Sequence, residues 1–133
     1  MSRILVVDDQ DEIREALVVI LEDEGHEVLE AESGHKALEL SHASHPDVVL
    51  LDIAMPEMDG LETLRRLKAD AVTRGIAVIM VTAQSDRHNL VTAVQLGVRD
   101  YITKPWESGE VEMCVNWALR AVQKARLAAA RCA

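Results

Sequence analysis

The sequence predicts a doubly wound α/β domain, a five-stranded parallel sheet with five helices. Two observations carry this prediction. Short apolar runs rich in Val, Ile and Leu are typical of strands that are buried on both faces. Segments with helical spacing lie between and after these runs. Because right-handed crossovers place the helices of such an alternation on both faces of a parallel sheet, the fold class follows.

The strands are expected in strongly apolar runs and in weaker ones that fit the alternation. The strong runs are Ile4 to Val7, Val48 to Leu51 and Ile76 to Val81, and the weaker ones are Glu27 to Ala31 and Asp100 to Thr103. A polar residue follows every run. We therefore expect each to be one strand of a single sheet.

The helices are predicted from apolar residues three or four positions apart. They are expected around Ile13, Leu17 and Ile20, around Ala37, Leu38 and Leu40, around Leu61, Leu64 and Leu67, near Asp86 to Leu96, and from Ser108 into the tail. Boundary residues agree with this interpretation. Gly25 suits a helix C-terminus and Ser33 an N-cap, while Asp59 followed by Glu62 resembles a capping box.

Composition limits both the size and the partners of the protein. With 133 residues, of which 49% are hydrophobic, the chain can bury one core. A net charge of −9 argues against binding to nucleic acid or to anionic membranes. No apolar run is long enough to span a bilayer and no signal-peptide pattern is present, so we expect a cytoplasmic protein. Cys114 and Cys132 lack the spacing of a zinc site and are expected to be free thiols.

The domain is expected to occupy residues 1–122, with a C-terminal helical extension or tail at residues 123–133. The tail is rich in Ala and Arg, so it should extend the last helix or fray. The tail would also suit a helical linker, in which case the chain would be one part of a longer protein.

Polar residues gather immediately after the apolar strands, which is the edge where open α/β sheets bind ligands. Asp8 and Asp9 follow the first strand, Asp52 the third, Thr82 the fourth and Lys104 the fifth. Carboxylates that are brought together repel one another unless a cation neutralises them. Ligation by oxygen alone, with room for water and a phosphate oxygen, is the pattern that Mg²⁺ prefers.

At this point the residues resemble a known family, the receiver domains of two-component response regulators. The resemblance rests on Asp8-Asp9, the run from Asp52 to Gly60, Thr82-Ala83, and Tyr101-Ile102-Thr103-Lys104-Pro105, and it covers roughly the first 120 residues. It implies the flavodoxin-like strand order 2-1-3-4-5 and a cis peptide bond between Lys104 and Pro105. Trp106 departs from the commonest pattern, in which Phe is frequent.

The resemblance also implies roles. Asp52 would be the phosphoacceptor, with Mg²⁺ bound by Asp9, Asp52 and the backbone carbonyl of Ala54, and by Asp8 through water. Lys104 and Thr82 would contact the phosphoryl group, and Thr82 and Tyr101 would form the switch. Such a domain catalyses only its own phosphorylation and dephosphorylation, so it is not expected to be an enzyme acting on an external substrate.

The partners that the resemblance implies are a sensor histidine kinase or phosphotransfer protein and a downstream protein or output domain. The surface of the fourth helix, fifth strand and last helix could form a homodimer. On the last helix Val111, Val115, Ala118 and Val122 make one apolar stripe, while Met113 and Trp117 point elsewhere. Trp117 either anchors a second contact face or packs on its own domain.

Two alternatives stay open. Asp8 and Asp9 could cap the first helix, instead of or together with a role at the metal site, because carboxylates are favoured at the positive end of a helix dipole. The domain could also be a scaffold that no longer signals by phosphate, although such a protein would more naturally lack Asp52, Lys104 or the acidic pair.

Overall fold

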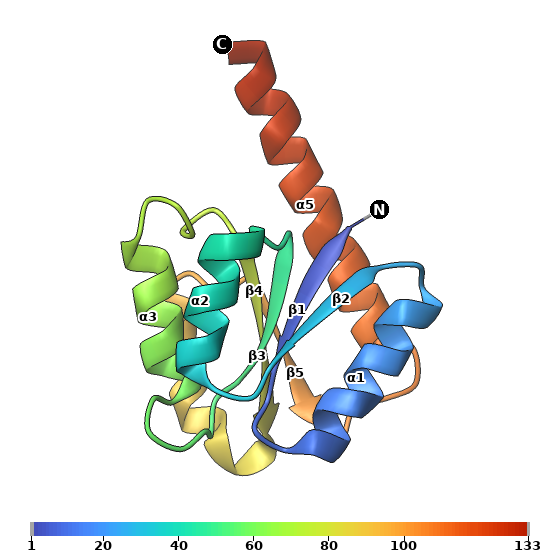
Figure 1. The fold of residues 1–133 in the computed structure, drawn as a ribbon, viewed down its shortest axis with the longest axis vertical. Helices are drawn as coiled ribbons and strands as arrows, with labels where there is room; N and C mark the ends of the chain where they lie inside the picture. The colour runs from blue at the N-terminus through green and yellow to red at the C-terminus, as the bar shows by residue number, and fades with distance from the viewer. Residues whose placement is uncertain (1, 133) are drawn as a thin grey trace.

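A computed structural model describes residues 2–132 and shows a parallel sheet of five strands in the order β2-β1-β3-β4-β5 (Figure 1). The strands are β1 (Arg3–Val7), β2 (Glu27–Ala31), β3 (Val48–Asp52), β4 (Ala77–Ala83) and β5 (Asp100–Lys104). Strand order and parallel pairing confirm the predicted fold. The central strand β3 is buried along its whole length, which explains its unbroken apolar run.

The helices alternate with these strands and cover both faces of the sheet. They are α1 (Asp11–Asp23), α2 (Gly34–Ser44), α3 (Gly60–Ala69), α4 (Leu90–Gln95) and α5 (Glu110–Cys132), and a 3₁₀ turn, η1 (Gln84–Asn89), precedes α4. In each strand, neighbouring side chains point to opposite faces, so the strands contribute to two separate cores.

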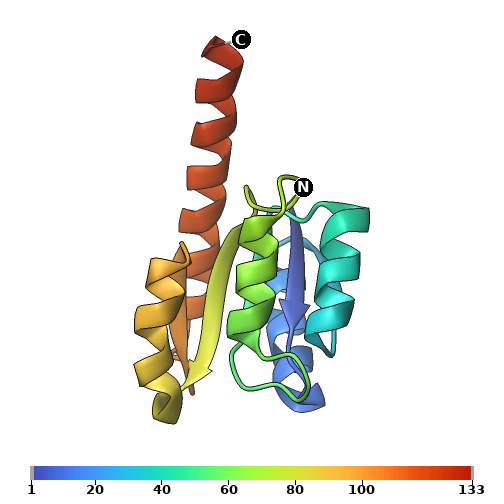
Figure 2. The ribbon, with the colours of Figure 1, turned by 90° about the vertical axis from the view of Figure 1, so that its left-hand side faces the viewer.

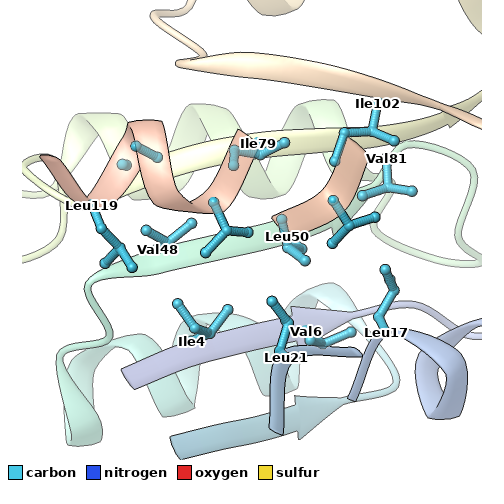
Figure 3. Packing of buried hydrophobic residues seen from close by; sticks show 14 residues of the cluster. Ile4, Val6, Leu17, Leu21, Val48, Leu50, Ile79, Val81, Ile102 and Leu119 are labelled. Atoms are coloured by element: carbon cyan, nitrogen blue, oxygen red, sulfur yellow. The ribbon is translucent and has the colours of Figure 1, made fainter. Parts of the chain in front are cut away.

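One core lies between the sheet and the helices α1 and α5 (Figure 3). It contains Ile4 and Val6 of β1, Leu50 of β3, and Leu17 and Leu21 of α1. The other core lies under α2, α3 and α4. It takes the alternate residues of the same strands, among them Leu5, Val7 and Leu51. The chain is therefore doubly wound, as expected.

Two of the predicted helix-end residues have the expected role, and the predicted capping box is only partly present. The Ser33 hydroxyl accepts a hydrogen bond from the Lys36 amide at 3.2 Å, and Gly25 has a φ of 86° just beyond α1. Asp59 caps α3 by accepting from the Glu62 amide at 2.9 Å. The Glu62 carboxylate, however, pairs with Arg65 and Arg66 and makes no return bond, so the capping box is only half formed.

Two helices begin later than the sequence suggests. The helix expected from Asp86 to Leu96 begins as the 3₁₀ turn η1, and only Leu90–Gln95 is α-helical. Such turns are frequent at helix N-termini, and Asn89 makes no side-chain cap for α4. The last helix starts at Glu110 instead of Ser108 because Gly109 has a φ of 84°, which no α-helix accommodates.

Helix α5 continues without a break to Cys132 and projects beyond the rest of the molecule (Figures 1 and 2). Val111, Val115 and Ala118 are buried against the sheet, whereas Trp117 is 67% exposed. Trp117 therefore does not pack within its own domain. Across residues 2–132, none of the helices is long and apolar enough to cross a membrane.

The segment between β3 and α3 folds back tightly on the end of β3. The Gly60 amide donates to the Ile53 carbonyl at 2.8 Å, and Met55 and Met58 are buried as packing residues. A Cβ at Gly60 would lie 2.1 Å from the Asp52 carbonyl oxygen. Glycine is required here because backbone approaches backbone.

We expect Gly60→Ala to lower the free energy of unfolding by about 2–3 kcal/mol, since the added methyl group would force the β3 end and α3 apart. Urea denaturation measures the change. Gly75→Ala is the matched control, because nothing lies within 4 Å of a Cβ at that position. Its effect should stay within about 0.5 kcal/mol. Equal effects of the two substitutions would show that the close approach does not matter.

Candidate functional site

The predicted site residues lie at the carboxyl edge of the sheet, opposite the projecting end of α5 (Figure 1). Asp8 follows β1, and Asp52, Ala83 and Lys104 are the last residues of β3, β4 and β5. The register pairs Ala83 with Lys104, so adjacent strands end at nearly the same level. Parallel pairing thus gathers residues that are far apart in the sequence.

Three carboxylates form the centre of the site. One oxygen from each of Asp8, Asp9 and Asp52 lies within 4.8 Å of the others. Asp8 and Asp52 are only 1% and 4% exposed, whereas Asp9 is open to solvent. Such a set of hard oxygen donors, with one side accessible, fits a small divalent cation such as Mg²⁺. The structure confirms that these residues cluster as the sequence predicted.

Lys104 holds the two buried carboxylates together. Its Nζ lies 2.9 Å from Asp8 Oδ2 and 3.3 Å from Asp52 Oδ1. The peptide bond between Lys104 and Pro105 is cis, as the resemblance implied. Burial disfavours the ammonium, but the hydrogen bond to Asp8 and the charge of Asp52 outweigh it and raise the pKa of Lys104. The lysine therefore stays charged in the cleft.

Asp52 is the carboxylate whose ionisation is most affected. Burial, followed by the charge of Asp8, raises the pKa of Asp52 to about 6, although Lys104 opposes the shift. The repulsion expected between the clustered carboxylates is thus present, and a single lysine does not remove it. A bound divalent cation would stabilise the ionised form.

The alternative in which Asp8 and Asp9 cap the first helix does not hold. Helix α1 begins at Asp11 and its N-cap residue is Gln10, which makes no side-chain cap. Asp8 Oδ1 accepts instead from the Gln10 amide at 2.8 Å, which fixes the loop before the helix. Both oxygens of Asp8 therefore have donors, one in the loop and one on Lys104.

The remaining predicted residues are not all in contact with the acidic centre. Ala54 lies two positions beyond Asp52 and is exposed. Thr82 is fully buried, and its hydroxyl donates to the Ala83 carbonyl at 3.1 Å. Tyr101 is 47% exposed on β5. The structure thus brings Asp8, Asp9, Asp52 and Lys104 together, with Thr82 at the end of the neighbouring strand.

Two features of the site were not expected from the sequence. Ile13, Ala16, Pro105 and Trp106 line an apolar groove of about 370 Å³ that opens beside Lys104. Arg14, on the first turns of α1, donates from Nη1 to the Asp8 carbonyl oxygen at 2.8 Å. The only available signal was the spacing of Asp11 and Arg14, which allows an ion pair on one helix face.

Fold and site together define a doubly wound α/β domain with an acidic, lysine-bridged cleft at the carboxyl ends of its strands. Residues 4–116 match the response regulator receiver domain family, and the chain belongs to that family. It takes part in two-component signal transduction, as the resemblance in the sequence implied.

Relatives and solved structures agree. The chain is 40% identical over 119 residues to the protein PilH of Pseudomonas aeruginosa, covering 90% of this chain and 98% of PilH. It is 41% identical to the phosphate regulon transcriptional regulatory protein PhoB of the same organism, over 88% of this chain, but it spans only 51% of PhoB. The receiver domain of NtrX from Brucella abortus superimposes with a TM-score of 0.83 at 33% identity, covering 88% of this chain and 98% of that one.

Because the pKa of Asp52 in the folded protein is about 6, above its ordinary value of 3.8, the folded state binds more protons than the unfolded state between about pH 4 and 6. Ionisation of Asp52 therefore lowers the free energy of unfolding as the pH rises through this window. We expect metal-free Asp52→Asn to be about 2 kcal/mol more stable than the wild type near neutral pH. Urea denaturation in a chelator should show the advantage shrinking towards about pH 4. An advantage that does not change with pH would contradict this assignment.

Proposed function

We propose that this receiver domain is a Mg²⁺-dependent phosphorylation switch in which Asp52 accepts a phosphoryl group from a histidine kinase or phosphotransfer protein. The observation that supports this most directly is the position of Lys104 Nζ, 2.9 Å from Asp8 and 3.3 Å from Asp52, inside a cluster of three carboxylates. Phosphoryl transfer to a carboxylate needs a positively charged side chain beside the nucleophile. It also needs oxygen ligands for a divalent metal ion.

In the transfer step, an Asp52 carboxylate oxygen forms a bond to phosphorus as the N–P bond of the donor's phosphohistidine breaks. The donor imidazole keeps the electron pair of that bond and then takes a proton from solvent. Lys104 offsets negative charge on the transferring group. Asp9, Asp52 and the Ala54 carbonyl, with Asp8 through water, would hold Mg²⁺, which neutralises charge on the phosphoryl oxygens. The domain would catalyse only this reaction and the hydrolysis of its own acyl phosphate.

The switch would follow from two residues near the end of the sheet. The Thr82 hydroxyl, which now donates to the Ala83 carbonyl, could donate instead to a phosphoryl oxygen. That exchange would draw the end of β4 towards Asp52. Tyr101, which is 47% exposed, could then turn inward. Phosphorylation would thereby change the surface around β5.

We propose that the surface of α4, β5 and α5 binds a downstream protein, an output domain or a second copy of the chain. Its exposed apolar residues are Val91 and Val94 of α4, Tyr101 of β5, and Met113 and Trp117 of α5. Large exposed aromatic residues often anchor protein interfaces. The cytoplasmic location expected from the sequence stays a prediction.

We expect wild-type protein incubated with acetyl phosphate and Mg²⁺ to gain the mass of one phosphoryl group, because Asp52 is the nucleophile. Asp52→Asn should gain none. Asp59→Asn is the matched control, since Asp59 is an exposed carboxylate in the following loop and asparagine also caps helices. Intact-mass spectrometry makes the comparison. Absence of an Asp52-dependent adduct would favour the alternative of a scaffold that does not signal by phosphate.

We expect a phosphoryl mimic to raise the solution mass of the protein if the surface of α4, β5 and α5 forms a homodimer. Light scattering with beryllofluoride and Mg²⁺, at several protein concentrations, measures this. Trp117→Ala should keep the protein monomeric, because it removes the most exposed side chain of the surface. Val72→Ala, which shortens an exposed valine elsewhere, should behave like the wild type. A monomer under all conditions would rule out dimerisation by this route.

A further inference from the structure

Arg14 lies on helix α1 and contacts the loop that carries Asp8 and Asp9. Its guanidinium donates to three acceptors: the Asp8 carbonyl oxygen at 2.8 Å, the Asp11 carboxylate at 2.6 Å and the Glu30 carboxylate at 3.1 Å. The side chain is only 15% exposed. Arg14 therefore ties together the loop after β1, the first turn of α1 and strand β2.

The contact with the Asp8 carbonyl controls the backbone between two of the clustered carboxylates. That carbonyl belongs to the planar peptide unit that joins Asp8 to Asp9, so fixing its oxygen also fixes the direction of the Asp9 amide. The Asp8 amide in turn donates to the Ala31 carbonyl at 3.1 Å. Asp8 is thus held on both sides of its α-carbon.

Asp9 depends on this peptide more than its neighbours do. Asp8 and Asp52 are buried and are both oriented by Lys104. Asp9 is exposed, yet its carboxylate belongs to the same cluster. A rotation of the Asp8–Asp9 peptide would swing the Asp9 side chain away from the other two carboxylates. The hydrogen bond from Arg14 to the Asp8 carbonyl restrains that rotation.

The charge of Arg14 is already offset where it stands. Asp11 and Glu30 both contact the guanidinium, so it offers little net positive charge to a phosphoryl group. Its planar fork, however, can satisfy several acceptors in one fixed geometry, which a lysine cannot do. The surroundings of Arg14 suit a residue that orients the loop better than one that binds the ligand itself.

We propose that Arg14 is a positioning residue that holds the Asp8–Asp9 peptide so that the Asp9 carboxylate is directed at the divalent cation. This inference rests on the proposed function, because it assumes that the acidic cluster binds Mg²⁺. It adds a residue outside the cluster whose loss should weaken cation binding through Asp9 alone.

The test is a double-mutant cycle on Mg²⁺ affinity, measured by isothermal titration calorimetry without any phosphodonor. Arg14→Ala should weaken binding about tenfold, in the range found when residues that orient metal ligands are removed. In an Asp9→Asn background the same substitution should change the affinity less than about twofold, because the carboxylate it orients is gone. Arg65→Ala, which removes an exposed arginine paired with Glu62 on α3, is the matched control and should bind like the wild type.

Arg14→Lys separates orientation from charge and guards against a variant that fails to fold. It keeps a positive charge but not the fork, so its Mg²⁺ affinity should fall nearly as far as that of Arg14→Ala. In metal-free protein, the NMR signal of the Asp9 amide should shift in both Arg14 variants, because the peptide is no longer held. Urea denaturation identifies which variants are folded.

The outcomes are distinct. If the wild type binds no Mg²⁺, the proposed function fails, whatever Arg14 does. If the wild type binds Mg²⁺ and Arg14→Ala binds equally well, the positioning role is wrong. It is also wrong if Arg14→Lys restores full affinity, or if Arg14→Ala weakens binding by the same factor with and without the Asp9 carboxylate.

Discussion

The ion-paired contact of Lys104 with Asp8 and Asp52 is the constraint on which the rest of the site depends. It joins β5 to the end of β1 across 96 positions of sequence. Two carboxylates that are almost fully buried would repel each other strongly, and burial alone penalises their charged forms. One ammonium can offset only part of this. The pKa of Asp52 remains raised to about 6, so the cleft is built to gain stability from a further cation.

The backbone around Asp52 is as tightly specified as its charge. Gly60 lies so close to the Asp52 carbonyl that a residue with a side chain does not fit there, and the Gly60 amide donates to the Ile53 carbonyl. Glu57 adopts a φ of 68°, a conformation that side chains other than glycine rarely accept. The loop therefore links the end of β3 directly to the first turn of α3. A displacement of Asp52 cannot occur without movement of this loop.

The strands and the acidic cleft could be predicted from sequence because both follow from short-range patterns. An unbroken apolar run such as Val48 to Leu51 is typical of a strand that is buried on both faces. Polar residues that follow such runs meet at one edge of a parallel sheet. The start of α5 was misplaced because nothing local shows that Gly109 takes a positive φ. Arg14 was missed because its acceptors, Asp8 in the loop after β1 and Glu30 on β2, become neighbours only when the chain folds.

Strand β5 and helix α5 connect the cleft to the far end of the molecule through one packed core. Lys104 is the last residue of β5, and Ile102, two positions earlier, belongs to the same core as Val111, Val115 and Ala118 of α5. Beyond this core, Arg126 bonds Asp47 at 2.6 Å, at the opposite edge of the sheet from the acidic site. Because α5 is one continuous helix from Glu110 to Cys132, a tilt at its packed half moves its projecting half as well (Figure 2). The ion pair between Arg126 and Asp47 is a further contact between α5 and the rest of the domain, at the edge of the sheet away from the acidic site.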